Sequence, residues 1–218
     1  MDKRNRPSKL PRGLHRISAI ALGLYALVHL ANHLVALRGI DSHIAFMRAV
    51  RQVTRVPAVE ALLLAAVAVQ VVSGVPMALR RKQPHPAQPR RRPLFDRLQA
   101  MSGLYLAFFL LVHVVSVLAG RSVLGLDTNF YFAAAGLQVK PYFLFFVPYY
   151  GLAVAALFTH LACVLRRRLP AGTPPATRDR AAWAGIATGA VLAVLIVAAF
   201  SGVFFDVGVP PAYLATFT

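Results

Sequence analysis

The sequence predicts an all-α integral membrane protein in which five transmembrane helices form one bundle. Three observations carry this prediction. Hydrophobic residues make up 58% of the 218 residues and charged residues only 14%, whereas a typical soluble domain has about 25% charged residues. The apolar residues stand in blocks long enough to span a bilayer, which takes about 20 residues. The basic residues, which give the chain a net charge of +17, lie in the gaps between these blocks.

Each apolar block is expected to be a helix, because a lipid-facing strand would leave its backbone groups without hydrogen bonds. The first block is longer than the apolar core of a signal peptide, and no small-residue cleavage site follows it. Pro57 suits the first turn of the second helix, where a missing N–H costs nothing. Either Pro141 or Pro148 starts the fourth. The five helices are predicted at residues 17–37, 57–79, 98–120, 142–165 and 181–205.

The distribution of Lys and Arg predicts the orientation. The segment before the first helix and the second and fourth gaps together hold 18 of the 24 basic residues. By the positive-inside rule the N-terminus is cytoplasmic and the C-terminus outside. These basic runs adjoin the membrane, which favours contact with anionic lipids over nucleic-acid binding. We therefore divide the chain into a basic segment (1–16), one transmembrane domain (17–205) with a Pro-rich linker at 83–93, and an outer tail (206–218).

The two halves of the chain resemble each other, which favours duplicated helix pairs 1–2 and 3–4. An offset of 84 residues aligns Ser18 with Ser102 and His29 with His113, together with the apolar residues around them. A rival offset of 80 aligns His33 with His113 instead. Either offset makes the two helix pairs parallel hairpins, with the fifth helix added to them.

The candidate chemistry lies in the histidines. An ionisable side chain in hydrocarbon is costly and normally faces the bundle interior with a partner, which indicates function. The alternative is an interhelical hydrogen bond that only holds helices together. Four histidines lie within the predicted spans, namely His29, His33, His113 and His160. The other three fall outside the spans and are expected to be solvated, namely His15, His43 and His85.

The depth of these histidines favours a haem. At 1.5 Å per residue, His29, His33 and His113 lie roughly 18, 24 and 23 Å from the cytoplasmic ends of their helices, in the outer half of the bilayer. Two imidazoles on facing helices at one depth are what a bis-histidine haem b requires. Outer arginines such as Arg38 and Arg121 are candidates to pair with its propionates. His160 lies near the cytoplasmic end, at the depth of Gln70.

Other patterns allow further interpretations. The His29-x-x-x-His33 pair is also compatible with a zinc or copper site. Glu60 is expected to pair with Arg55 or Arg51. The aromatic gap at 121–147 indicates either an interfacial belt on the outer surface or a lid over a quinone entrance. The small residues Gly185 and Gly189 indicate close helix packing.

The residues Ser102 to His113 (SGLYLAFFLLVH) and Ser18 to His29 resemble patterns of the five-helix cytochrome b membrane subunits of succinate dehydrogenases and fumarate reductases. In that family four helices each supply one haem-ligating His. The resemblance implies His113 with His29 or His33 as one ligand pair and His160 as a further ligand. The stretch from Gln70 to Gly74 resembles an H-x-x-x-G ligand motif in which Gln stands for His. We therefore expect one haem, with His160 left as the single imidazole of a second site or bonded to Gln70.

The resemblance also implies a quinone as reaction partner, a place in the bacterial cytoplasmic membrane and partner subunits that carry flavin and iron–sulfur centres. Cys163 is the only cysteine and no G-x-G-x-x-G motif occurs, so those centres belong to separate chains. Whether the chain itself takes part in catalysis is left open. The runner-up interpretation is a haem-free polytopic membrane protein, either a transporter or an assembly partner, whose histidines bond between helices.

Overall fold

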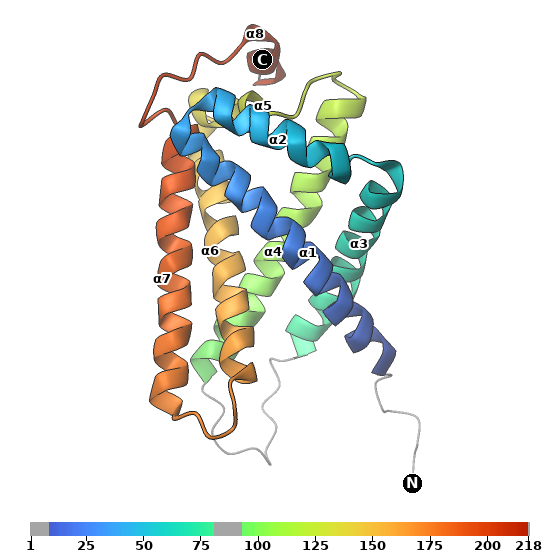
Figure 1. The fold of residues 1–218 in the computed structure, drawn as a ribbon, viewed down its shortest axis with the longest axis vertical. Coiled ribbons are helices and arrows are strands. Elements are labelled where there is room, and N and C mark those ends of the chain that lie inside the picture. Colours follow the sequence, from blue (N-terminus) through green and yellow to red (C-terminus); the bar gives the residue numbers. More distant parts are fainter. Residues whose placement is uncertain (1–8, 81–92, 218) are drawn as a thin grey trace.

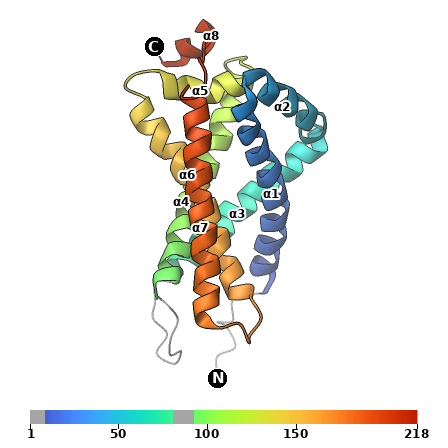
Figure 2. The ribbon, with the colours of Figure 1, turned by 60° about the vertical axis from the view of Figure 1, so that its left-hand side comes forward.

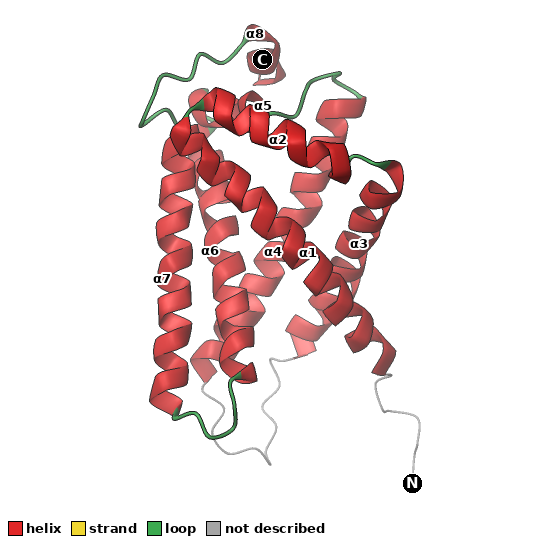
Figure 3. Ribbon diagram, viewed as in Figure 1, coloured by secondary structure: helices red, strands yellow, loops and turns green. Residues whose placement is uncertain are grey.

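The computed structural model describes residues 9–80 and 93–217, and every regular element within these ranges is helical (Figure 3). The long helices are α1 (Lys9–Val35), α3 (Pro57–Arg80), α4 (Pro93–Ser122), α6 (Phe143–Arg168) and α7 (Pro175–Phe200). The short ones are η2 (Ala36–Arg38), α2 (Ile40–Thr54), α5 (Phe130–Gln138), α8 (Pro211–Leu214) and η3 (Ala215–Phe217). His85 and all but the last residue of the predicted linker lie outside the described residues.

Each long helix is apolar enough to cross a membrane. The five segments are Gly13–Arg38, Pro57–Leu79, Leu94–Ser122, Phe143–Arg168 and Pro175–Phe200. Within their most apolar windows only 11–28% of the residues are buried inside the protein, so most apolar side chains face outwards, where lipid would cover them. The prediction of an all-α integral membrane protein with five spanning helices is confirmed.

The five long helices run alternately along the bundle (Figures 1 and 2). Helices α1, α4 and α7 run toward the end at which α2, α5 and α8 lie, whereas α3 and α6 run away from it. We call this end the outer end, following the orientation that the basic residues predict. Helix α1 packs on α3, α3 on α4, α4 on α6 and α6 on α7. The chain thus forms two antiparallel pairs, α1–α3 and α4–α6, with α7 packed against the second pair.

The α6–α7 interface is the closest in the bundle because small residues let the two backbones approach. A Cβ atom at Gly189 would lie 2.2 Å from Cβ of Phe158, and one at Gly185 would lie 3.1 Å from Cβ of Ala162. No side chain fits at Gly189 unless the helices move apart. The interpretation of these two glycines as packing residues is confirmed.

Ion pairs join α6 to its neighbours α7 and α4 at the inner end of the bundle. Asp179 on α7 pairs with Arg166 on α6 at 2.6 Å, and both side chains are nearly buried, with 11% and 16% of their surface exposed. The guanidinium of Arg166 also lies 4.4 Å above the ring of Phe95 on α4. Arg167 pairs with Asp96 in the same place. These contacts join α4, α6 and α7 at the inner end of the bundle.

The helix boundaries differ from the predicted ones where proline or glycine overrides hydropathy. Helix α7 begins at Pro175, six residues before the predicted start, because proline suits the first helical turn. It ends at Phe200, before Gly202 adopts a φ of +79°. Pro148 lies inside α6 and does not start it, while Pro141 precedes its first residue by two. Helix α1 begins at Lys9, beyond the inner end of the predicted span, since a helix continues beyond its apolar part.

Two of the gaps between the predicted spans contain helices at the outer end. Helix α2 lies across this end and buries His43 and Met47. Helix α5 is buried among the spanning helices, with Phe130 and Ala134 at 0% exposure. The interpretation of the 121–147 gap as an interfacial belt is therefore wrong for α5, which belongs to the core.

Candidate functional site

A cavity of about 1330 Å³ extends along the bundle between α1, α3, α4 and α6. It is larger than the roughly 300–1,000 Å³ of a typical small-molecule pocket. Its walls are mostly apolar, and its polar side chains gather toward the outer and the inner end. The predicted site residues that line it are His29, His33, His113, His160, Gln70 and Arg121. Arg38 does not line it and is exposed at the end of η2, so the structure does not bring this residue to the site.

Four histidines meet near the outer end, and we call them the outer histidine group: His29 and His33 from α1, His43 from α2, and His113 from α4. The Nε2 atoms of His29 and His33 are 3.1 Å apart. The ring centres of His29 and His113 are 6.0 Å apart across the cavity. The prediction that His29, His33 and His113 come together is confirmed as geometry, whereas their role as iron ligands stays a prediction.

The two facing imidazoles are held in the same way. The ring of Tyr25, one turn before His29, lies 5.6 Å from it with an interplanar angle of 18°. The ring of Phe109, one turn before His113, lies 5.1 Å from it at 14°. These pairs correspond under the offset of 84 residues. An aromatic ring nearly parallel to each imidazole restricts its rotation.

His43 belongs to this group although the sequence placed it in a solvated gap. Only 2% of its surface is exposed, and its Nε2 lies 3.4 Å from Nδ1 of His33 and 3.2 Å from Nδ2 of Asn32. Burial, together with the nearby charges of His29 and Arg51, lowers the pKa of His43 to about 4. The expectation of a solvated His43 is wrong, because α2 folds onto the bundle and carries its apolar face inward.

The inner end of the cavity holds a second polar set. The side-chain amide of Gln70 on α3 donates to the backbone oxygen of His15 at 2.6 Å and to Oγ of Ser18 at 2.7 Å, both on α1. Nδ1 of His15 lies 2.8 Å from Oγ of Ser73. His15 is thus half-buried and bonded, and the expectation that it is solvated is wrong. Gln70 takes its partners from α1, so the alternative in which it bonds to His160 is wrong as well.

His160 has a place in the second helix pair that corresponds to Gln70 in the first. Its Nδ1 lies 3.5 Å from Oγ of Ser102 on α4. Ser18 and Ser102 are the residues that the 84-residue offset aligns, and each contacts the next spanning helix, α3 and α6 respectively. A Cβ at Gly103 would lie 3.2 Å from Cε1 of His160, so this glycine lets the imidazole rest against α4.

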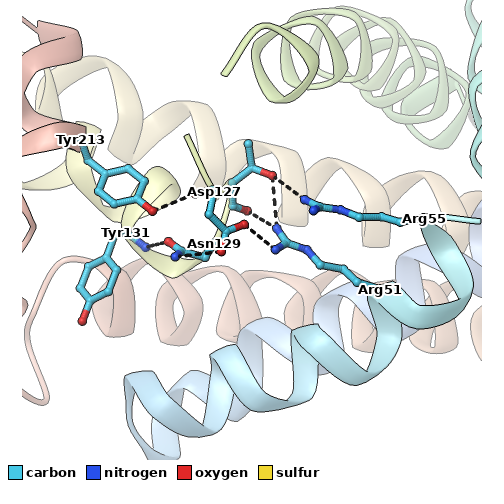
Figure 4. A network of polar contacts seen from close by, with 7 residues as sticks. Arg51, Arg55, Asp127, Asn129, Tyr131 and Tyr213 are labelled. Atoms are coloured by element: carbon cyan, nitrogen blue, oxygen red, sulfur yellow. Dashed lines mark hydrogen bonds and ion pairs between the residues drawn. The ribbon is translucent and has the colours of Figure 1, made fainter. Parts of the chain in front are cut away.

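Charged residues line the outer end of the cavity, which we call its mouth. Figure 4 shows the polar contacts of two of them, Arg51 and Arg55. Arg51 on α2 pairs with Asp127 at 2.6 Å and donates to the backbone oxygen of Thr128 at 2.8 Å. Arg55 donates to Oγ1 of Thr128 at 3.2 Å, and partial burial and the neighbouring Arg51 and Arg121 lower its pKa. Tyr213 from α8 donates to the backbone oxygen of Asp127 at 3.0 Å. This network ties α2 and the C-terminal residues to the loop before α5.

Arg121, at the end of α4, pairs with Glu60 at the start of α3 at 2.5 Å. The expectation that Glu60 pairs with Arg51 or Arg55 is wrong, because the ends of α3 and α4 are neighbours while α2 turns its arginines to the loop. Three arginines therefore face two carboxylates at the mouth, those of Glu60 and Asp127, so the net charge of this group of side chains is positive. The arginines are Arg51, Arg55 and Arg121.

Comparison with models of protein families, with curated proteins and with solved structures gives no match. Within residues 9–80 and 93–217 no group of three or more His, Cys, Asp or Glu side chains is arranged to hold a metal ion. His33 turns Nε2 to His29 and Nδ1 to His43, so these three imidazoles do not converge on one point. Within the described residues, the pair His29 and His33 therefore has no third ligand for a zinc or copper ion.

The residue that sequence reasoning missed is His43, and the signal for it was present. In the 1–2 gap Ile40, His43, Ile44 and Met47 follow the spacing of one helix face, and Gly39 precedes them. An amphipathic helix at a membrane surface places such a face against the bundle.

Proposed function

We propose that the protein is a haem b-binding electron-transfer subunit of a membrane oxidoreductase, with one haem held by His29 and His113. The single observation that carries the proposal is the distance of 6.0 Å between the two ring centres across the cavity. Metal–nitrogen bonds of about 2 Å, with each nitrogen about 1 Å from its ring centre, put two imidazoles that share one iron about 6 Å apart. The separation of the two ring centres therefore suits a bis-histidine haem.

The rest of the cavity supports the same ligand. Apolar side chains of α1, α3, α4 and α6 make most of the cavity wall, which suits a flat, largely apolar group. Arg51, Arg55 and Arg121 at the mouth supply cations for two propionates. A bound haem b supplies one-electron chemistry. The chain's own residues bind and orient it: His29 and His113 as ligands, with Tyr25 and Phe109 holding their rings.

The proposed partners rest on the sequence resemblance in residues 18–29 and 102–113. They are a membrane quinone and separate flavoprotein and iron–sulfur subunits, in a bacterial cytoplasmic membrane. The inner end favours one haem over two, because Gln70 bonds to α1 at the place where an inner ligand would be needed. An amide does not replace an imidazole as a strong axial ligand.

A second candidate function is a haem-free membrane protein with structural histidines. The observation that favours it is the contact of 3.1 Å between His29 and His33, which already gives each imidazole a polar partner. One measurement distinguishes the two candidate functions. We expect protein purified in detergent, with haem supplied during expression, to show a reduced-minus-oxidised b-type spectrum with about one haem per chain. A colourless preparation would refute the proposed function and favour the haem-free one.

A further inference from the structure

Three of the outer histidines form a hydrogen-bonded row that leads from α2 into the bundle. His43 contacts His33 through Nε2 and Nδ1 at 3.4 Å, and His33 contacts His29 through the two Nε2 atoms at 3.1 Å. A neutral imidazole carries one N–H and one bare nitrogen, so in such a row the tautomer of each member determines that of the next. The row therefore has only two self-consistent arrangements.

Asn32 distinguishes between them. Its amide nitrogen Nδ2 lies 3.2 Å from Nε2 of His43, and an amide nitrogen only donates. With the amide in this orientation, which leaves Oδ1 of Asn32 and Nδ1 of His43 unpaired among the described residues, Nε2 of His43 is the acceptor, and its single lone pair is shared by Nδ2–H of Asn32 and Nδ1–H of His33. Nε2 of His33 is left bare and accepts the N–H of His29 Nε2. The lone pair of His29 consequently stands on Nδ1.

Aromatic side chains keep this row in place. The ring of Phe200 on α7 stands nearly perpendicular to His33 and to His43, with ring centres at 5.1 and 5.4 Å. The ring of Phe130 on α5 stands edge-on to His43 at 5.4 Å. Phe130 and Phe200 are 0% and 4% exposed. Rotation of either imidazole would require these buried rings to move, so α2, α5 and α7 together fix the orientation of groups on α1.

We propose that His43 is a positioning residue which, through His33, fixes the tautomer and orientation of the haem-ligating imidazole of His29. This inference rests on the proposed function. Outer hydrogen-bond partners of a ligating histidine orient its ring and raise its basicity, and losing one costs about 10–100-fold in affinity for the metal group. His43 acts on the haem without contacting it. A residue outside the membrane-spanning helices thereby sets the properties of a ligand inside them.

The test compares three variants of the haem-loaded protein. His43→Leu removes the acceptor at the end of the row, His43→Gln retains one in its amide oxygen, and Met47→Leu changes the same buried face of α2 without a polar group. Two quantities are measured: the midpoint potential of the haem and the rate of its transfer to apomyoglobin. We expect His43→Leu to raise the potential and to speed haem loss about 10–100-fold. We expect His43→Gln and Met47→Leu to stay near the wild type.

Other results overturn the inference. If His43→Leu leaves potential and haem loss unchanged, or if His43→Gln changes them as much, His43 has only a packing role. A colourless wild-type protein overturns the proposed function and this inference with it. Nitrogen NMR of reduced, histidine-labelled wild-type protein gives an answer that needs no variant: a bare Nε2 on His43 supports the row as described, and a protonated Nε2 contradicts it.

Discussion

The burial of His43 predicts that the stability of the protein falls in weak acid. Its ordinary pKa of about 6.5 applies to the unfolded chain, whereas in the fold burial, with His29 and Arg51 nearby, lowers its pKa to about 4. Between these values the unfolded chain binds a proton that the folded chain does not bind. Stability therefore rises with pH in this window, is fully present above about pH 6.5 and is lost as the pH falls.

The size of the effect follows from the two pKa values. At about pH 5 the unfolded His43 is almost fully protonated and the folded one is mostly neutral, which corresponds to about 2 kcal/mol of lost stability. Substitution by a neutral side chain removes this contribution. We expect His43→Gln to be less stable than the wild type near pH 8, through lost packing, but to show a flatter dependence on pH.

The assay is equilibrium unfolding in detergent micelles, followed by circular dichroism at several pH values between about 4 and 8. The difference between wild type and His43→Gln cancels the titration of groups distant from His43. It reports on His43 together with His33, because the contact between them couples their titration. Met47→Leu serves as a control and should run parallel to the wild type. If the free energy of unfolding changes equally with pH in wild type and His43→Gln, the reasoning is refuted. A protein with a buried neutral histidine must become less stable as the pH falls.

Two further predictions concern contacts between α6 and α7. Gly189→Ala places a Cβ 2.2 Å from Cβ of Phe158, and we expect overpacking to cost about 1–3 kcal/mol in unfolding experiments. Gly23→Ala, with no atom within 4 Å of its new Cβ, is the matched control; a similar loss there would contradict this explanation. Asp179→Ala leaves Arg166 nearly buried without its carboxylate, and we expect a loss of about 3 kcal/mol by the same measurement. A loss no larger than that of an exposed ion pair, about 1 kcal/mol or less, would show that the pair is solvated.

The five spanning helices could be predicted because a bilayer imposes a length of apolar chain that few other structures require. The rise of a helix placed His29, His33 and His113 in the outer half of the bilayer, and the offset of 84 residues paired His29 with His113. The distance of 6.0 Å between the ring centres of His29 and His113 could not be predicted, since it depends on how α1 and α4 are placed on the two sides of the cavity.

The hydropathy pattern did not predict the short outer helices α2 and α5, for opposite reasons. Helix α2 alternates charged and apolar residues, so its average hydropathy is unremarkable while its buried face carries His43. Helix α5 is apolar throughout, and its composition does not distinguish a buried helix from an interfacial loop. The partners of Glu60 and Gln70 depend on which helix ends are neighbours, and that information is tertiary.

The measurement that tests the account most directly is the absorption spectrum of His113→Ala beside that of His160→Ala. His113 faces His29 in the outer histidine group, whereas His160 lies at the inner end against Ser102. The account predicts that His113→Ala loses the low-spin bis-histidine spectrum, because one strong axial bond is missing, and that His160→Ala keeps it. If His160→Ala loses the haem while His113→Ala keeps it, the haem lies at the inner end and the account is contradicted.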